Sequence, residues 1–193
     1  LDKDRDPQVY AVGIKELWKV PGRLAAGSVI HTLGAPLWNT FGGGWIYGMS
    51  GDIIDIGLVT GLDYADPTTD PHDNFQRYKL HPAIRALLEG GEMIRYGAKA
   101  IPEGGVHAMP RFYADGLCIV GDSAGFLNGL RLKGIHLAMK SGMMAAEAIF
   151  DALQAGDTSA NKLSAYETKF TASWARTELH AARNFHQGFS GGL

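Results

Sequence analysis

A carboxylate set among glycines is the feature of this sequence with the clearest chemistry. Residues 117–120 form a short apolar run, and Gly121, Asp122 and Gly125 follow it directly. An apolar run bounded by glycines is typical of a strand buried in an α/β sheet, and ligands bind where such strands end. The carboxylate of Asp122 can accept hydrogen bonds from sugar or ribityl hydroxyls, and glycine lets the backbone approach a bulky ligand. The pattern therefore favours a nucleotide cofactor.

The segment after Gly134 changes to helical periodicity. Its first N–H groups and the positive end of its dipole suit a phosphate. The predicted inner face consists of small or apolar residues: Ile135, Ala138, Met139, Gly142, Ala145, Ala146, Ile149 and Leu153. Charged residues share the opposite face. An ordinary strand–helix unit with a glycine-rich loop is the alternative interpretation.

A second candidate site is the glycine run that follows Phe41. Gly42, Gly43 and Gly44 expose backbone groups, and the aromatic residues beside them can form an apolar slot for a flat ring such as a quinone. A β-bulge or a tight turn also explains glycines at the start of a strand, and it is the preferred explanation from the residues alone.

Composition excludes several other classes of function. The chain has 193 residues, of which 46% are hydrophobic and 20% charged, so it can bury a core as one unit or two small ones. A net charge of −2 without a basic run argues against nucleic-acid binding. The single cysteine, Cys118, excludes a disulfide framework. The histidines lack the spacing of metal ligands, and Ser123 lacks the partners of a hydrolase nucleophile, so neither a metal site nor a catalytic residue is predicted.

The elements predicted from the pattern indicate a mixed α+β fold. Strands are expected over residues 10–20, 44–49, 53–62 and 92–101, with a hairpin turn at 50–52. Asp70-Pro71 is a typical helix start, and a second short helix is expected over residues 82–88. An aromatic stripe between residues 163 and 179 predicts a C-terminal helix that faces the core, and no stretch is apolar enough to span a bilayer.

Many short segments, taken in order, resemble the electron transfer flavoprotein–ubiquinone oxidoreductase family. They are residues 12–18, 31–37, 41–44, 57–64, 75–82, 89–91, 121–128 and 133–147. The resemblance covers nearly the whole chain. Asp122 is a departure, because it stands where some members carry Cys and where a broader group of related flavin reductases has Asp.

The resemblance implies a fold and a set of ligand contacts. The chain would hold part of an FAD/NAD(P)-binding-like domain plus a quinone-binding β-sheet subdomain. The expected divisions are a ubiquinone-binding subdomain at 1–105, a C-terminal FAD-binding segment at 106–160, and a helix with a glycine-rich tail at 161–193. The implied FAD contacts are Gly121, Asp122, Gly125, Asn128, Lys133, Gly134 and Ile135, and the implied quinone contacts are Phe41, Gly42, Gly43 and Gly44.

The same resemblance implies partners and missing parts. Electron transfer flavoprotein would donate electrons, ubiquinone would accept them, and the protein would touch the bacterial or mitochondrial inner membrane peripherally. A 4Fe-4S cluster needs about four thiolates, so with one cysteine it belongs to a region absent here, as does the G-x-G-x-x-G fingerprint. We therefore expect an excised portion of a longer enzyme, inactive alone. The alternatives are a geranylgeranyl reductase-like flavoenzyme acting on polyprenyl lipids and a non-catalytic excised domain.

Overall fold

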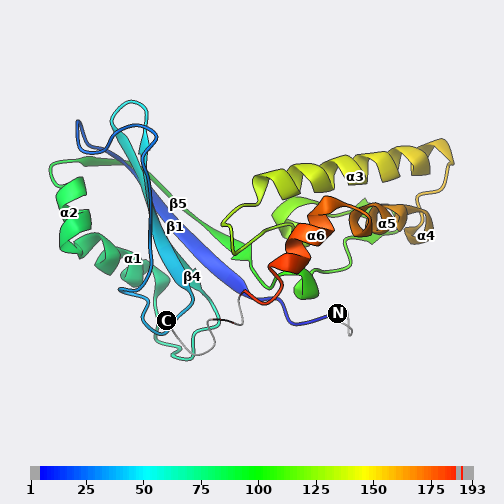
Figure 1. Ribbon diagram of the computed structural model, residues 1–193, viewed down its shortest axis with the longest axis horizontal. Coiled ribbons are helices and arrows are strands. Elements are labelled where there is room, and N and C mark those ends of the chain that lie inside the picture. Colours follow the sequence, from blue (N-terminus) through cyan, green and yellow to red (C-terminus); the bar gives the residue numbers. More distant parts are fainter. Residues whose placement is uncertain (1–4, 186–187, 189–193) are drawn as a thin grey trace. The chain divides into compact units, whose positions relative to one another are not determined.

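The computed structural model describes residues 5–185 and residue 188, and the chain folds as two compact units (Figure 1). Residues 10–101 form the first, which we call the sheet unit. Residues 102–185 form the second together with residues 5–9, and we call it the helical unit. Each unit has a hydrophobic core of its own.

The sheet unit is built on a five-stranded sheet with the strand order β2-β3-β4-β1-β5. The strands are β1 (Tyr10–Lys19), β2 (Val29–Thr32), β3 (Gly42–Met49), β4 (Ile53–Gly61) and β5 (Glu92–Pro102). β3 and β4 form the expected hairpin, and β4 also pairs antiparallel with β1. The mixed α+β fold is thus confirmed, and the predicted strands are present. β2, which pairs antiparallel with β3, was not predicted.

Two helices follow the hairpin, α1 (Pro71–Leu80) and α2 (Pro82–Leu88). The Asp70 carboxylate accepts a hydrogen bond of 2.8 Å from the His72 N–H, so the predicted start of α1 is confirmed. This bond satisfies one of the N–H groups that a helix start leaves without an intrahelical partner. Both helices lie on the same side of the sheet (Figure 1).

The core of the sheet unit lies between these helices and one face of the sheet. Because side chains alternate along a strand, even-numbered residues of β3 and β4 share the helix side. The buried members are Val20, Leu37, Ile46, Ile54, Ile56, Leu58, Phe75, Tyr78, Ile84 and Leu88. The opposite face, which we call the open face, is covered by neither α1 nor α2.

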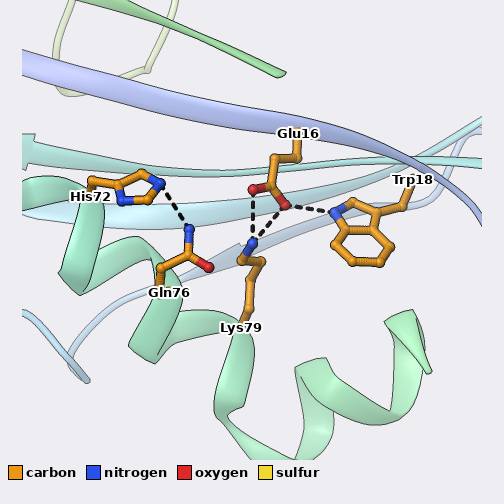
Figure 2. Close-up of polar contacts among 5 residues, drawn as sticks. All are labelled: Glu16, Trp18, His72, Gln76 and Lys79. Carbon is orange, nitrogen blue, oxygen red and sulfur yellow. Dashed lines mark hydrogen bonds and ion pairs between the residues drawn. The ribbon is translucent and has the colours of Figure 1, made fainter. Parts of the chain in front are cut away.

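One charged group enters this core from the sheet. Glu16 on β1 points toward α1, where Lys79 Nζ lies 2.7 Å from its Oε1 atom (Figure 2). The indole of Trp18 donates a hydrogen bond of 2.7 Å to Oε2 of the same carboxylate. Both oxygen atoms therefore have partners, as a buried carboxylate requires.

The helical unit consists of one long helix with short elements packed against it. These elements are η1 (Val106–Ala108), β6 (Tyr113–Ala114), β7 (Leu117–Cys118), η2 (Gly121–Ala124), α3 (Ile135–Gln154), α4 (Ala160–Leu163), α5 (Ala165–Thr171) and α6 (Trp174–Ala181). Phe112 is the centre of the core, with its ring in edge-to-face contact with Phe126, Tyr166 and Phe170. Such ring pairs add to the stabilisation that burial alone provides.

Two details of the predicted strand and helix are wrong. Residues 117–120 are not a strand buried on both faces, because β7 covers only Leu117–Cys118, pairs with β6 in a small hairpin, and leaves Leu117 and Val120 exposed. The buried face of α3 is also different from the predicted one: it consists of Leu137, Ser141, Met144, Ala145, Ala148 and Ala152. Of the predicted inner residues, Ile135, Met139, Ile149 and Leu153 are exposed.

The C-terminal aromatic stripe is divided among α4, α5 and α6 and is buried for most of its length. Leu163, Tyr166, Phe170 and Leu179 are buried, whereas Trp174 at the start of α6 is half exposed. Residues 189–193 of the glycine-rich tail lie outside the described residues. Across the part of the chain that the structure describes, no helix combines the length and the apolar character needed to cross a membrane.

Candidate functional site

The loop that carries Asp122 lies against the first turns of α3. The Gly121 N–H donates a hydrogen bond of 2.8 Å to Ser141 Oγ, and that hydroxyl donates to the Ala138 carbonyl at 2.7 Å. Gly121 and Gly125 have φ angles of +68° and +82°, which glycine adopts without strain. The structure thus brings the Gly121–Gly125 loop and the start of α3 together, as the cofactor prediction requires.

The start of α3 has donors and apolar surface available to a ligand. Gly134 is its N-cap residue and, having no side chain, makes no capping hydrogen bond. Ile135, the next residue, is 81% exposed. A Cβ on Gly134 would lie 2.9 Å from Leu127 Cδ1, so close packing as well as ligand access explains this glycine. Free N–H donors beside an apolar side chain suit a phosphate or the edge of a flavin ring.

Asn128 and Lys133 are brought together by backbone pairing. The N–H of each residue donates to the carbonyl of the other, at 2.9 and 3.2 Å. The Asn128 amide is buried, donates to Glu178 Oε1 at 2.8 Å and accepts from the Arg131 N–H at 3.2 Å. Its side chain therefore shapes the loop before α3, whereas Lys133 is exposed.

A polar cluster that was not predicted lies beside this loop. His136 Nε2 is 3.0 Å from Glu178 Oε1, and the imidazole stacks on Trp174 with the ring centres 5.8 Å apart. Burial raises the pKa of Glu178, but hydrogen bonds from Asn128 and His136 outweigh this effect and hold the pKa below its usual value. The sequence gives no local signal for the cluster, because its members come from α3, α6 and the loop between residues 128 and 133.

The glycine run at the start of β3 is closely packed on both faces of the sheet. A Cβ on Gly44 would lie 2.4 Å from the Tyr78 ring, and one on Gly43 would lie 2.8 Å from the Thr32 carbonyl oxygen. Gly42 has a φ angle of +152° and faces the Val59 carbonyl. All three glycines are thus needed by the fold, which agrees with the structural explanation of the run.

An apolar surface nevertheless lies beside Gly43. The Leu33 side chain is 71% exposed, and its Cδ2 atom is 3.1 Å from the position of a Gly43 Cβ. Trp38 is also largely exposed, and its indole lies over Gly34. Phe41 is half buried at the end of this segment. Of the predicted quinone contacts Phe41, Gly42, Gly43 and Gly44, the structure thus places Gly43 next to an exposed apolar side chain, that of Leu33, from the segment between β2 and β3.

Within the described residues, no group of three or more His, Cys, Asp or Glu side chains is arranged to hold a metal ion. Cys118 packs against the core of the helical unit, and burial raises the pKa of its thiol. A raised pKa disfavours the reactive thiolate.

Residues 10–101 match the family model described as ETF-QO, ubiquinone-binding. A probable electron transfer flavoprotein-ubiquinone oxidoreductase of Acinetobacter baylyi is 41% identical over 96% of this chain and 36% of its own length. The Pseudomonas aeruginosa enzyme is 44% identical over 96% of this chain and 34% of its own. The mitochondrial enzyme of Arabidopsis thaliana is 45% identical over 96% of this chain and 29% of its own. The chain thus spans well under half the length of these relatives.

Solved structures share the fold at lower sequence identity. A geranylgeranyl bacteriochlorophyll reductase-like protein from Thermoplasma acidophilum superposes with a TM-score of 0.73 at 18% identity, covering 98% of this chain and 45% of that one. A flavin-dependent brominase superposes with a TM-score of 0.65 at 21% identity, and the match covers 96% of this chain and 46% of the brominase chain. These likenesses show that the arrangement of strands and helices is one found in flavoproteins.

Proposed function

Because this chain belongs to the electron transfer flavoprotein–ubiquinone oxidoreductase family, we propose that it is part of a longer enzyme that passes electrons from reduced electron transfer flavoprotein to ubiquinone. The observation that carries the proposal is the 44% identity to the Pseudomonas aeruginosa enzyme over 96% of the chain. This identity extends across both compact units. It supports the family assignment more strongly than the shared fold does, because one fold serves many chemistries.

In this proposal the two units have different ligands. The sheet unit, which corresponds to the matched residues 10–101, binds the quinone head group beside Phe41–Gly44. The helical unit contributes the C-terminal FAD-binding segment through Gly121, Asp122, Gly125, Lys133, Gly134 and Ile135. The compact units divide between residues 101 and 102, and the divisions proposed at residues 105 and 160 stay predictions about ligand binding.

The residues at the start of α3 fit FAD. Uncapped N–H groups can bind a phosphate or a flavin carbonyl, Ile135 can contact the ring, and the Asp122 carboxylate can accept from a ribityl hydroxyl. Ser141 holds the Gly121–Gly125 loop in place through its bond to the Gly121 N–H. When bound, FAD would supply the electron-transfer chemistry, and this chain would bind and orient it.

Other parts of the enzyme lie outside this chain in the proposal. A 4Fe-4S cluster needs about four thiolates, and this chain has one cysteine, so the cluster belongs to another region of the longer protein. We place that protein peripherally at the bacterial or mitochondrial inner membrane, where ubiquinone is dissolved. The isolated chain is proposed to be inactive.

A second candidate function is the reduction of polyprenyl lipids. It is favoured by the superposition on the geranylgeranyl bacteriochlorophyll reductase-like protein, whose TM-score is 0.73. The identity to that protein is only 18%, so the likeness reports the fold. A non-catalytic role of the isolated chain is the third possibility, and it is compatible with the chain being part of a longer enzyme.

The test is to purify the longer protein and follow its two half-reactions separately by stopped flow. Reduced electron transfer flavoprotein should reduce the bound flavin, and a short-chain ubiquinone should reoxidise it. A protein that saturates the double bonds of a polyprenyl substrate and leaves ubiquinone unchanged would replace the first function with the second. An isolated chain that binds neither flavin nor quinone, beside a longer protein that binds both, would support the non-catalytic role.

A further inference from the structure

The open face of the sheet carries a group of polar side chains that the glycine run does not explain. Odd-numbered residues of β3 and β4 point to this face, opposite the helices. Register places Tyr47 of β3 directly opposite Asp55 of β4, and His31 of β2 directly opposite Trp45 of β3. Side chains on neighbouring strands at such positions interact. The strand pairing therefore gathers four functional side chains on a face that α1 and α2 leave uncovered.

These side chains are linked by hydrogen bonds. The Tyr47 hydroxyl lies 3.3 Å from His31 Nε2, and their rings meet edge to face. Trp45 Nε1 donates a bond of 2.9 Å to Asp55 Oδ1, and Lys15 Nζ lies 3.4 Å from Oδ2. The Asp55 side chain is only 12% exposed, whereas His31 is exposed to solvent. The Tyr47–His31 pair thus reaches solvent, and Trp45 and Lys15 form a separate set of contacts around the Asp55 carboxylate.

Apolar side chains frame the Tyr47–His31 pair. Val29, directly opposite Tyr47, is 63% exposed, and Leu33, which follows the end of β2, is 71% exposed. Gly43 lies on this face also, four residues before Tyr47, and it is next to Leu33. A few polar groups within an apolar surface are typical of a site for a small, largely apolar ligand. A quinone head group, with two carbonyl oxygens on an apolar ring, has this character.

We propose that Tyr47 donates a proton to a carbonyl oxygen of the quinone and that His31 returns a proton to Tyr47 from solvent. The proposal rests on the proposed function, quinone reduction. Tyr47 would be the catalytic residue, His31 the group that acts through it, and Asp55 a positioning residue that holds Trp45 beside them.

The step balances in atoms and electrons. Each quinone takes up two electrons from the enzyme's reduced flavin and two protons, and becomes the quinol. For one proton, the O–H bond of Tyr47 breaks while an O–H bond forms on the quinone oxygen. The His31 imidazolium then gives its Nε2 proton to the Tyr47 oxygen and takes a new one from water. The second proton reaches the other carbonyl oxygen from solvent.

The surroundings of Tyr47 suit this role. Burial raises the pKa of Tyr47, and the nearby Asp55 carboxylate raises it further. The phenol therefore carries its proton at neutral pH, as a proton donor must, and its raised pKa makes it a weaker acid than a solvent-exposed tyrosine. The charged or titratable groups that face it are His31 from β2 and Asp55 from β4, with Lys15 from β1 paired to Asp55.

The experiment compares Tyr47→Phe, His31→Gln and wild type in the longer, flavin-containing protein. Tyr47→Phe keeps the ring and removes the proton, so reoxidation of the flavin by a short-chain ubiquinone should slow roughly 100-fold, the usual contribution of a general acid. Flavin reduction by electron transfer flavoprotein, the KM for quinone and quinone binding followed by tryptophan fluorescence should stay unchanged. Tyr96→Phe is the matched control, because Tyr96 is 78% exposed on β5 of the same sheet.

A solvent isotope effect distinguishes proton transfer from a structural role. In D2O the wild-type quinone half-reaction should slow more than flavin reduction does, and Tyr47→Phe and His31→Gln should each diminish this difference. An unchanged rate and isotope effect in Tyr47→Phe, or equal slowing of both half-reactions, would overturn the inference while leaving the proposed function intact. A wild-type protein that reduces its flavin but never passes electrons to quinone would instead overturn the proposed function, and the inference with it.

Discussion

Lys79 Nζ lies 2.7 Å from Glu16 Oε1 in the interior of the sheet unit, and this contact joins α1 to β1. The exposed fractions of the two side chains are 13% for Lys79 and 8% for Glu16. The ammonium group also lies over the ring of Phe75, 4.9 Å from its centre. Two charges removed from water in this way are costly to separate, because the partner that remains has no solvent to stabilise it.

The first prediction is that Lys79→Met lowers the free energy of unfolding of the chain by about 3 kcal/mol. The change leaves the Glu16 carboxylate buried with only the Trp18 N–H as a partner. Denaturant unfolding followed by tryptophan fluorescence measures the loss. Combining Lys79→Met with Glu16→Gln should recover much of it, because the buried charge is then gone.

Arg77→Met is the matched control for this prediction. Arg77 is paired with Asp73 one helical turn away on α1, and both side chains are largely exposed. Exposed pairs of this kind contribute about 0.3–0.5 kcal/mol. A loss in Arg77→Met as large as that in Lys79→Met would show that burial of the Glu16–Lys79 pair is not the cause.

The second prediction concerns the contact between Gly44 and α1. Gly44→Ala places a methyl group where the Tyr78 ring lies, 2.4 Å away, so the ring or the helix must move. Overpacking of this kind costs about 1–3 kcal/mol. Thermal unfolding should show a lower midpoint, and Gly44→Ala combined with Tyr78→Leu should be more stable than Gly44→Ala alone.

Gly97→Ala on β5 is the control for Gly44, since a Cβ there meets no atom within 4 Å. It should leave the midpoint unchanged or raise it, because alanine restricts the unfolded chain more than glycine does. An equal fall of the unfolding midpoint in both variants would mean that these strands need glycine for a reason other than room for the Tyr78 ring.

The third prediction is a dependence of stability on acid pH that comes from Glu178. Because the folded-state pKa lies below the ordinary value of 4.5, the unfolded chain binds the proton more tightly. The stabilisation is therefore complete above that ordinary value and is lost as the pH falls through the folded-state pKa. The free energy of unfolding, measured between pH 3 and pH 7, should depend more steeply on pH in wild type than in Glu178→Gln.

Glu147→Gln separates this effect from that of other carboxylates. Glu147 also has a lowered pKa, caused by its hydrogen bond from Lys169, but it is solvent-exposed and its ion pair is screened. The pH dependence should be nearly unchanged in that variant. Identical profiles for wild type and Glu178→Gln would contradict the role of the His136–Glu178–Asn128 contacts.

The fourth prediction is that Asp122→Ala weakens FAD binding by the longer protein. A hydrogen bond to a charged acceptor contributes about 1.5–3 kcal/mol, so the dissociation constant should rise roughly tenfold or more. Two measurements report the change: the amount of flavin released on gel filtration, and titration of the apoprotein with FAD. Asp151→Ala, an exposed carboxylate on the far end of α3, should retain the flavin. Undiminished flavin content in Asp122→Ala would remove Asp122 from the site.

Local signals predicted much of the fold. Asp70 and Pro71 set the start of α1 because capping depends on residues that are adjacent in the chain. The β3–β4 hairpin was predicted because its turn residues lie between two apolar runs. β2 was missed because Val29–Thr32 is only four residues long and is a strand through its pairing with β3.

Side-chain placement was harder to predict than the elements. On α3 the stripe with Leu137 and the stripe with Ile135 both consist mainly of apolar or small residues, so periodicity alone could not choose between them. The glycines around Asp122 were predicted to contact a cofactor, which stays a prediction, and the hydrogen bond from the Gly121 N–H to Ser141 was not predicted. The Tyr47–His31 contact was not predicted, because it depends on the register of the strand that was missed.

The exposed side of α3 has a practical consequence. Ile135, Met139, Met143, Phe150 and Leu153 expose apolar side chains along a helix of 20 residues. Contiguous apolar surface of this kind promotes aggregation when it meets water or another copy of itself. Recombinant preparations of this chain alone should therefore self-associate with increasing concentration, bind hydrophobic dyes and respond to mild detergent. Exchanging Met139 and Met143 for glutamine should improve yield and give a sharper sedimentation profile without altering the core.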